Sequence, residues 1–162
     1  MVESTGNLSK EMRVFISNHV LGGALVGVVA KRHPVLALGL GFASHFVMDS
    51  NKHWGTREGS DFMKVAKRDG LLGLSLVAGA LWLSDDKVST SLAILGAVGP
   101  DLDHPAQHFF NRTIWPEKLT QFHSRIQRNK ESPHHINREL FVGVGLVGLL
   151  LASKALSGSK KY

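Results

Sequence analysis

The stretch ASHFVMDSNKHWG, residues 43–55, sets three metal-binding side chains at four-residue intervals: His45, Asp49 and His53. Residues four apart on an α-helix share one face, so two such side chains can reach the same cation. The neighbouring residues are apolar and favour burial. The spacing therefore predicts a buried metal site, with a simple helix contact between His45 and Asp49 as the alternative.

A second group of candidate ligands follows another apolar segment. The string GPDLDHPAQH, residues 99–108, contributes Asp101, Asp103 and His104. His19 lies inside the first apolar segment of the chain. Carboxylates and imidazoles from several helices can complete one metal shell. The alternative for the two aspartates is a helix cap, with Pro105 in the first turn.

A third group stands in ESPHHINRE, residues 131–139. Ser132 is expected to be an N-cap and Pro133 the first helical residue. The helix that follows would place His135 and Glu139 on one face, four residues apart. We expect this pair to bind metal, with a solvated loop as the alternative for the histidines.

Five uncharged stretches of 13 to 17 residues must position these groups. The composition, with 43% apolar residues and little period-two alternation, predicts an all-α fold in a single domain over residues 1–162. Residues 1–12 and 155–162 are expected to be flexible. The five stretches are Val14–Ala30, Pro34–Met48, Leu71–Ser84, Val88–Pro100 and Leu140–Ser153.

The connections between these stretches predict an up-and-down bundle of about five helices. The links at 31–33 and 85–87 are short enough to form antiparallel hairpins. The two long polar connections, 49–70 and 101–139, then fall together at the opposite end. All the candidate ligands named above lie at that end, which therefore becomes the predicted metal site.

Composition limits the metal and the partners. The chain has no cysteine, so any metal must be held by nitrogen and oxygen ligands, which suit zinc and also manganese or iron. We expect one to three ions. The net charge of +6 fits an anionic partner and equally a soluble basic protein. The basic segment from Arg112 to Arg138 could hold a phosphate or form a solvated face against lipid headgroups. Specific binding to nucleic acid is not expected, because no recognised binding motif accompanies this segment.

A membrane location is expected, with a soluble cytoplasmic protein as the alternative. The apolar stretches are shorter than the roughly 20 residues of a typical spanning helix. They carry small residues four apart, at Gly23/Gly27, Gly39/Ala43 and Ser75/Gly79, which allow close helix packing in lipid. Of the 19 Lys and Arg residues, 13 lie at the predicted site end, so that end is expected to face the cytoplasm.

Three strings together resemble a known family: NHVLGGALVG (18–27), GFASHFVMDSNKHWG (41–55) and GAVGPDLDHP (96–105). They are similar to small bacterial membrane-associated metal-dependent hydrolases of the LexA-regulated type, and to their relatives in the zinc-dependent phospholipase C and nuclease superfamily. The likeness spans roughly residues 18–139. It implies a helical fold with up to three zinc ions, held through His45/Asp49 and His135/Glu139.

One family string is different here. After Pro-Asp-x-Asp-His the family carries Arg-Gly-x-Thr-His, whereas this chain reads FHSRIQRNKESPHH over residues 122–135. His123, His134 and His135 are the candidates to replace its histidine. Otherwise the third metal position is missing.

The expected function is metal-dependent hydrolysis of a phosphoester, with phospholipid headgroups or a nucleotide-like diester as substrate. A bound transition metal lowers the pKa of water toward about 7, and a pair of ions can hold both the attacking and the leaving oxygen. Asp49, Asp101 or Glu139 would bridge metals or accept the water proton. The alternative is a membrane-associated structural or interaction protein whose metal site is closed and inactive.

Overall fold

The computed structural model describes residues 15–54, 60–127 and 131–159, and confirms the all-α class. Seven α-helices and two 3₁₀ turns, Gly99–Leu102 and Pro133–His135, account for most of these residues. The helices are α1 (Ile16–Val29), α2 (Pro34–Asp49), α3 (Ser60–Leu83), α4 (Lys87–Val98), α5 (Asp103–Phe110), α6 (Glu117–Gln127) and α7 (Ile136–Ser159).

The five predicted stretches correspond to α1, α2, α3, α4 and α7, and two more helices form within the second long connection. α5 and α6 are short and polar, so a search for uncharged stretches does not find them. α3 begins at Ser60, so nearly half of its length precedes the apolar stretch from Leu71 that predicted it. Residues 155–159 continue α7 instead of forming a separate tail.

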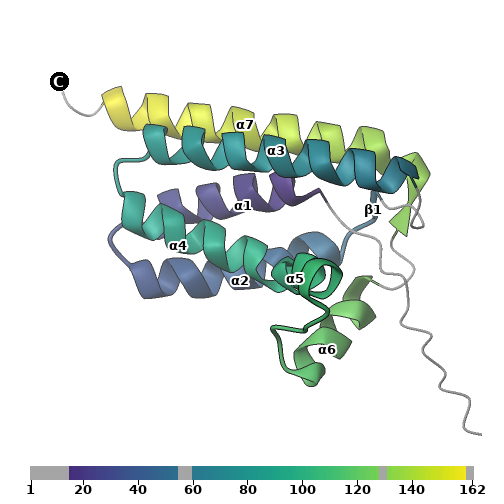
Figure 1. Ribbon diagram of the computed structural model, residues 1–162. Coiled ribbons are helices and arrows are strands. Elements are labelled where there is room, and N and C mark those ends of the chain that lie inside the picture. Colours follow the sequence, from purple (N-terminus) through teal and green to yellow (C-terminus); the bar gives the residue numbers. More distant parts are fainter. Residues whose placement is uncertain (1–14, 55–59, 128–130, 160–162) are drawn as a thin grey trace, which may run out of the picture.

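α1 lies at the centre of the apolar helices and packs against α2, α3, α4 and α7 (Figure 1). α4 packs most extensively against α2 and α1. The turns 30–33 and 84–86 lie at one end of these helices, together with the end of α7. The end of α2, the 3₁₀ turn after α4 and strand β1 lie at the other end, which we call the site end.

Glycines bring α4 unusually close to its two neighbours. A Cβ added to Gly27 of α1 would lie 2.6 Å from the Cα of Thr90, and one added to Gly41 of α2 would lie 2.1 Å from the carbonyl oxygen of Ala93. The predicted role of Gly23 and Gly27 in close packing is therefore confirmed. The same prediction for Gly39 and Gly79 is wrong, because an added Cβ there meets nothing within 4 Å.

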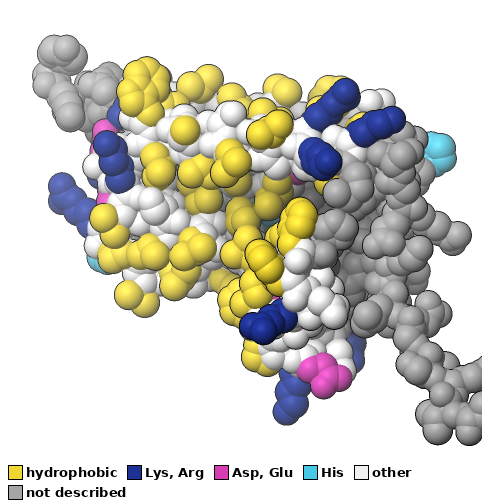
Figure 2. All heavy atoms as spheres, viewed as in Figure 1, with side chains coloured by type: hydrophobic (Ala, Val, Ile, Leu, Met, Phe, Trp, Pro, Cys, Tyr) yellow, Lys and Arg dark blue, Asp and Glu magenta, His cyan; other side chains and the backbone are white. Residues whose placement is uncertain are grey.

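The interior of the bundle is small and polar, while the large apolar side chains point outward. Among the described residues, the largest fully buried side chains include His19, His45, His53 and Asp49, and six of the ten buried apolar residues are alanines. Exposed leucines, valines and aromatic residues cover the outer surfaces of α2, α3 and α7, and Figure 2 shows hydrophobic side chains along the visible face of the bundle. A protein that folds in water normally has the opposite arrangement.

Two short parallel strands join the long connections at the site end. β1 (His53–Trp54) pairs with β2 (Glu131–Ser132), with His53 opposite Glu131 and Trp54 opposite Ser132. A parallel pair requires chain segments that are far apart in sequence. The pairing brings the chain after α2 next to the chain that enters α7.

Candidate metal centre

α2 presents His45 and Asp49 toward the centre of the site end, as their spacing predicted. Both side chains are fully buried, and His45 Nε2 lies 3.1 Å from Asp49 Oδ2. His45 Nδ1 lies 2.8 Å from the carbonyl oxygen of Ala97 in α4. A carbonyl only accepts, so Nδ1 carries a proton and Nε2 is the ring nitrogen that faces Asp49.

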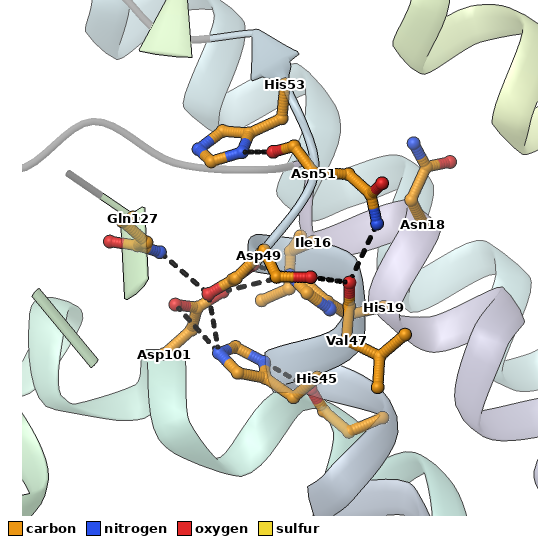
Figure 3. A network of polar contacts seen from close by, with 12 residues as sticks. Ile16, Asn18, His19, His45, Val47, Asp49, Asn51, His53, Asp101 and Gln127 are labelled. Atoms are coloured by element: carbon orange, nitrogen blue, oxygen red, sulfur yellow. Dashed lines mark hydrogen bonds and ion pairs between the residues drawn. The ribbon is translucent and has the colours of Figure 1, made fainter. Parts of the chain in front are cut away.

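Three further side chains from three other segments complete the group, and Figure 3 labels two of them, His19 and Asp101. His19 of α1 lies 3.2 Å from Asp49, between its Nε2 and Oδ1. Asp101, in the 3₁₀ turn after α4, lies 3.8 Å from His19 Nε2 and 4.0 Å from His45 Nε2. His123 Nε2 lies 2.7 Å from Asp49 Oδ2. Three imidazoles and two carboxylates therefore meet in one buried volume, which we call the metal centre.

α6 delivers His123 together with Gln127 from outside the bundle. Gln127 Nε2 donates to Asp49 Oδ2 at 2.8 Å, and the aromatic ring of Phe122 packs against Phe46 of α2 with centroids 5.2 Å apart. Sequence reasoning named His123 as one of three replacement candidates and did not consider Gln127. Their four-residue spacing was the available signal, but it stands in a polar segment that looks like a surface helix.

The distances in the metal centre lie on both sides of those expected around a transition metal. Ligand atoms about 2.0–2.2 Å from a tetrahedral zinc ion lie roughly 3.3–3.6 Å from one another. The six imidazole–carboxylate distances range from 2.7 to 4.0 Å. His45, Asp101 and His123 offer ligand atoms within 4.8 Å of one another, as do His19, His45 and Asp49. Nitrogen and oxygen ligands of this kind suit zinc, manganese or iron.

Hydrogen bonding also leaves room for a cation. Among the described residues, His19 Nδ1 has no hydrogen-bond partner, and His19 Nε2 and Asp49 Oδ1, 3.2 Å apart, form an ion pair without hydrogen-bond geometry. Buried polar atoms of this kind are costly unless something satisfies them. His45 Nε2 and His123 Nε2 lie 3.0 Å apart, and both lie within 3.1 Å of Asp49 Oδ2. A cation among these atoms would satisfy the buried groups together.

The electrostatics keep Asp49 ionised. Burial alone would raise its pKa, but the hydrogen bond with His123 and the imidazoles of His19 and His45 hold the pKa of Asp49 well below its usual range. An ionised carboxylate is the form that binds a metal. The Asp49 carboxylate is thus an anionic candidate ligand that is fully buried.

Asp69 of α3 fixes the start of α1, and with it the position of His19. Its carboxylate accepts hydrogen bonds from the backbone N–H groups of Ile16 (2.6 Å) and Ser17 (3.4 Å) and from the Ser17 hydroxyl. These backbone groups lie in the first turn of α1, where the helix itself offers no acceptor. Asp69 therefore acts as a helix cap supplied by another helix.

The structure does not bring Glu139 and His135 into the metal centre. Glu139 is buried in α7, where its carboxylate accepts from Asn18 Nδ2 (2.5 Å) and from the Trp54 backbone N–H (3.3 Å). His135 is only half-buried, at the end of the 3₁₀ turn that Ser132 caps. No group of metal-ligating atoms that includes either residue forms within the described parts of the chain.

Three other predicted ligands have different surroundings. Asp103 Oδ1 accepts from the backbone N–H groups of Ile114 and Trp115, so it holds the loop between α5 and α6. α2 ends at Asp49, so His53 lies beyond the helix in β1, where its buried Nδ1 donates to the Asn51 carbonyl. The side chain of His104 lies outside the described residues.

A cavity of about 110 Å³ lies at the opposite end of the bundle from the metal centre. Lys31, Asp85 and Lys154 are among its lining residues, and both lysines pair with Asp85. The metal centre is therefore separate from this cavity.

No protein-family model, curated protein or solved structure matches the chain.

Proposed function

We propose that this chain is a metal-dependent phosphoester hydrolase at a membrane, with zinc as the most suitable metal. The observation that carries the proposal is the convergence of three imidazoles and two carboxylates in one buried volume, with unsatisfied atoms on His19 and Asp49. The resemblance to metal-dependent hydrolases in three strings supports the same assignment. In this proposal α1, α2, α3, α4 and α7 form an up-and-down bundle to which α5 and α6 are added.

His19, His45, Asp49, Asp101 and His123 would hold the metal. When bound, a transition metal supplies a Lewis acid and lowers the pKa of water toward about 7. Asp101 keeps slight exposure, at 5%, whereas Asp49 has none, so Asp101 is the better placed of the two to accept a proton from water. Gln127 donates to Asp49 and thereby fixes the orientation of that carboxylate.

The membrane part of the proposal rests on α7 and on the outward apolar side chains. Residues 136–156 of α7 have a mean hydropathy of 1.8 and are long enough to cross a bilayer, and only 6% of this apolar segment is buried. A core helix of a soluble protein would be mostly buried. We therefore propose α7 as the principal membrane-spanning helix.

Metal analysis and turnover test the function. Protein purified without added metal should contain transition metal, and it should hydrolyse a bis-aryl phosphodiester with zinc or manganese and lose this activity with a chelator. His45→Ala and Asp101→Asn should reduce turnover at least about a hundredfold, the scale expected when a metal ligand or the nucleophile it activates is lost. His33→Ala, at an exposed turn, is the matched control. A metal-loaded protein without turnover would reject the hydrolase.

The second candidate is a structural metal site. The near-complete burial of all five ligands favours it, because a closed shell has no position for water or substrate. This candidate predicts the same metal content and the same loss of metal in His45→Ala, but no turnover on any phosphoester.

A further inference from the structure

We propose that α5 and α6, with the loop between them, form an interfacial anchor that lies in the headgroup region of an anionic lipid leaflet. The segment, residues 103–127, extends sideways from the site end of the bundle (Figure 1). The proposal goes beyond the hydrolase assignment and uses only its membrane part.

The first observation is a cluster of exposed apolar side chains on this anchor. Phe109 and Phe110 at the end of α5 are 70% and 73% exposed, and Ile114 in the following loop is 55% exposed. Figure 2 shows hydrophobic side chains gathered over α5 and continuing onto the bundle. Aromatic side chains at this level are typical of membrane interfaces, where an apolar ring meets the headgroups.

The second observation is the division of α6 into two faces. His123 and Gln127 are buried against the metal centre, whereas Lys118 and Arg125 are exposed on the opposite side of the helix, and Phe122 is half-exposed beside Phe46 of α2. Arg112 adds a third exposed basic residue in the loop. Basic side chains next to apolar ones favour an anionic lipid surface over a neutral one.

The third observation is that the anchor is firmly attached. Asp103 accepts from the backbone of Ile114 and Trp115, and the Trp115 indole donates to the carbonyl of Gly99 at 3.0 Å. The loop is therefore held against the 3₁₀ turn that carries Asp101. Lipid contact at the outer face would consequently fix the helix that supplies His123 to the metal centre.

The test uses nitroxide labels on single cysteines, which is direct because the chain has no cysteine of its own. Phe110→Cys reports on the anchor, Val144→Cys on the outer face of α7, and Lys87→Cys on the exposed turn at the far end. Each protein is placed in nanodiscs of phosphatidylcholine with phosphatidylglycerol. Collision with oxygen reports lipid, and collision with a water-soluble nickel chelate reports water.

We expect the labels at positions 110 and 144 to favour oxygen and the label at 87 to favour nickel. Lys118→Glu with Arg125→Glu should move the label at 110 into water, because each basic residue near an anionic surface contributes a preference of about fivefold. Lys67→Glu with Arg68→Glu makes the same charge change on α3 and should leave the label at 110 in lipid.

Each other outcome identifies a different failure. A label in water at 110 with a label in lipid at 144 would overturn the anchor and keep the membrane location. Labels in water at both positions would reject the membrane location itself. If the label at 110 stays protected from the nickel chelate without lipid, this surface is assigned to a second copy of the chain. If only an oligonucleotide protects it, the surface is assigned to nucleic acid. If the label at 110 lies in lipid but the metal-loaded protein hydrolyses no phosphodiester, only the hydrolase assignment is rejected.

Discussion

At the scale of single residues, the backbone decides which nitrogen of His45 can bind a metal. The carbonyl of Ala97 accepts a hydrogen bond from Nδ1–H, so Nε2 is the nitrogen that faces Asp49. Helix α4 thus orients a candidate ligand that helix α2 provides. Such an outer partner commonly fixes the tautomer of a metal-binding histidine.

Removing the side chain of His45 or Asp49 should therefore lower the metal content and the melting temperature together. We expect His45→Ala and Asp49→Ala to lose metal and to melt about 5–10 °C lower, because metal present at about a hundred times its Kd adds roughly 2.7 kcal/mol to a folded site. Metal analysis and thermal unfolding of the same preparations measure both effects. His33→Ala should change neither quantity, and unchanged metal content in both site variants would contradict the assignment.

Glu139 is predicted to stabilise the fold without binding the metal. Its carboxylate accepts from Asn18 and from the backbone of Trp54, so Glu139→Ala leaves buried donors unsatisfied and should cost about 1–3 kcal/mol. Metal content should stay at the wild-type level, as measured by elemental analysis of the folded fraction. Loss of metal in Glu139→Gln, which keeps an acceptor oxygen, would instead make Glu139 a ligand.

At the scale of helices, the spacing of glycines sets the distance between α2 and α4. Gly41→Ala would push a methyl group into the backbone of Ala93, whereas Gly39→Ala, on the same helix, meets open space. We expect Gly41→Ala to lower the melting temperature and also the metal content, since His45 lies one turn further along. Gly39→Ala should stabilise by up to about 1 kcal/mol through helix propensity. Equal behaviour of the two variants would contradict the packing argument.

The carboxyl group of Asp69 at the start of α1 should make the free energy of unfolding depend on pH. Burial raises the pKa of Asp69 above its ordinary value of 3.8, although hydrogen bonds from Ser17 and Ile16 oppose this. The folded protein thus keeps the proton to higher pH than the unfolded chain. The resulting stabilisation is complete below pH 3.8 and is lost as the pH rises through the raised pKa.

We therefore expect the melting temperature of the wild type, minus that of Asp69→Asn, to be larger near pH 4 than near pH 7. Asp85 provides the control, because Lys154 and Lys31 hold its pKa down to about 2. The corresponding difference for Asp85→Asn should not be larger near pH 4, because a lowered pKa gives stability that is lost as the pH falls from 3.8 toward about 2. A difference for Asp69→Asn that grows toward pH 7 would mean that the ionised carboxylate is the form the fold prefers.

The sequence predicts those elements whose signal is local. The uncharged stretches predict five of the helices, and the four-residue spacing predicts the pairing of His45 with Asp49. The position of α6 depends on contacts made across the fold, such as Phe122 with Phe46, and a local pattern does not contain them. The surroundings of Glu139 could not be predicted for the same reason, since its partner Asn18 is 121 residues away in the chain.

At the scale of the whole molecule, the arrangement of charge and apolar surface defines two different ends. The site end carries Lys52, Lys67 and Arg68, and the far end carries Lys31, Asp85 and Lys154. Outward apolar side chains occupy the region between them. Charged residues on both sides of an apolar band are typical of a protein inserted in a bilayer.

The distribution of basic residues predicts which end faces the cytoplasm. Along the sequence, thirteen of the 19 Lys and Arg residues lie in the N-terminal segment and the two long connections, and six lie in the tight turns and the C-terminal segment. Basic residues are retained on the cytoplasmic side during insertion, so the metal centre should open toward the cytoplasm. Single cysteines at Lys52 and Lys87, treated with an impermeant maleimide in intact cells, measure this orientation.

We expect Lys87→Cys to react in intact cells and Lys52→Cys to react only after lysis, since these exposed positions mark the two ends of the bundle. The reverse pattern would place the metal centre on the outer side and require a substrate found there. Protection at both positions, with full reaction after lysis, would mean that neither end crosses the bilayer. In that case α7 would lie against the membrane or against another protein instead of spanning it, and the exposed apolar surface of the bundle would need a different partner.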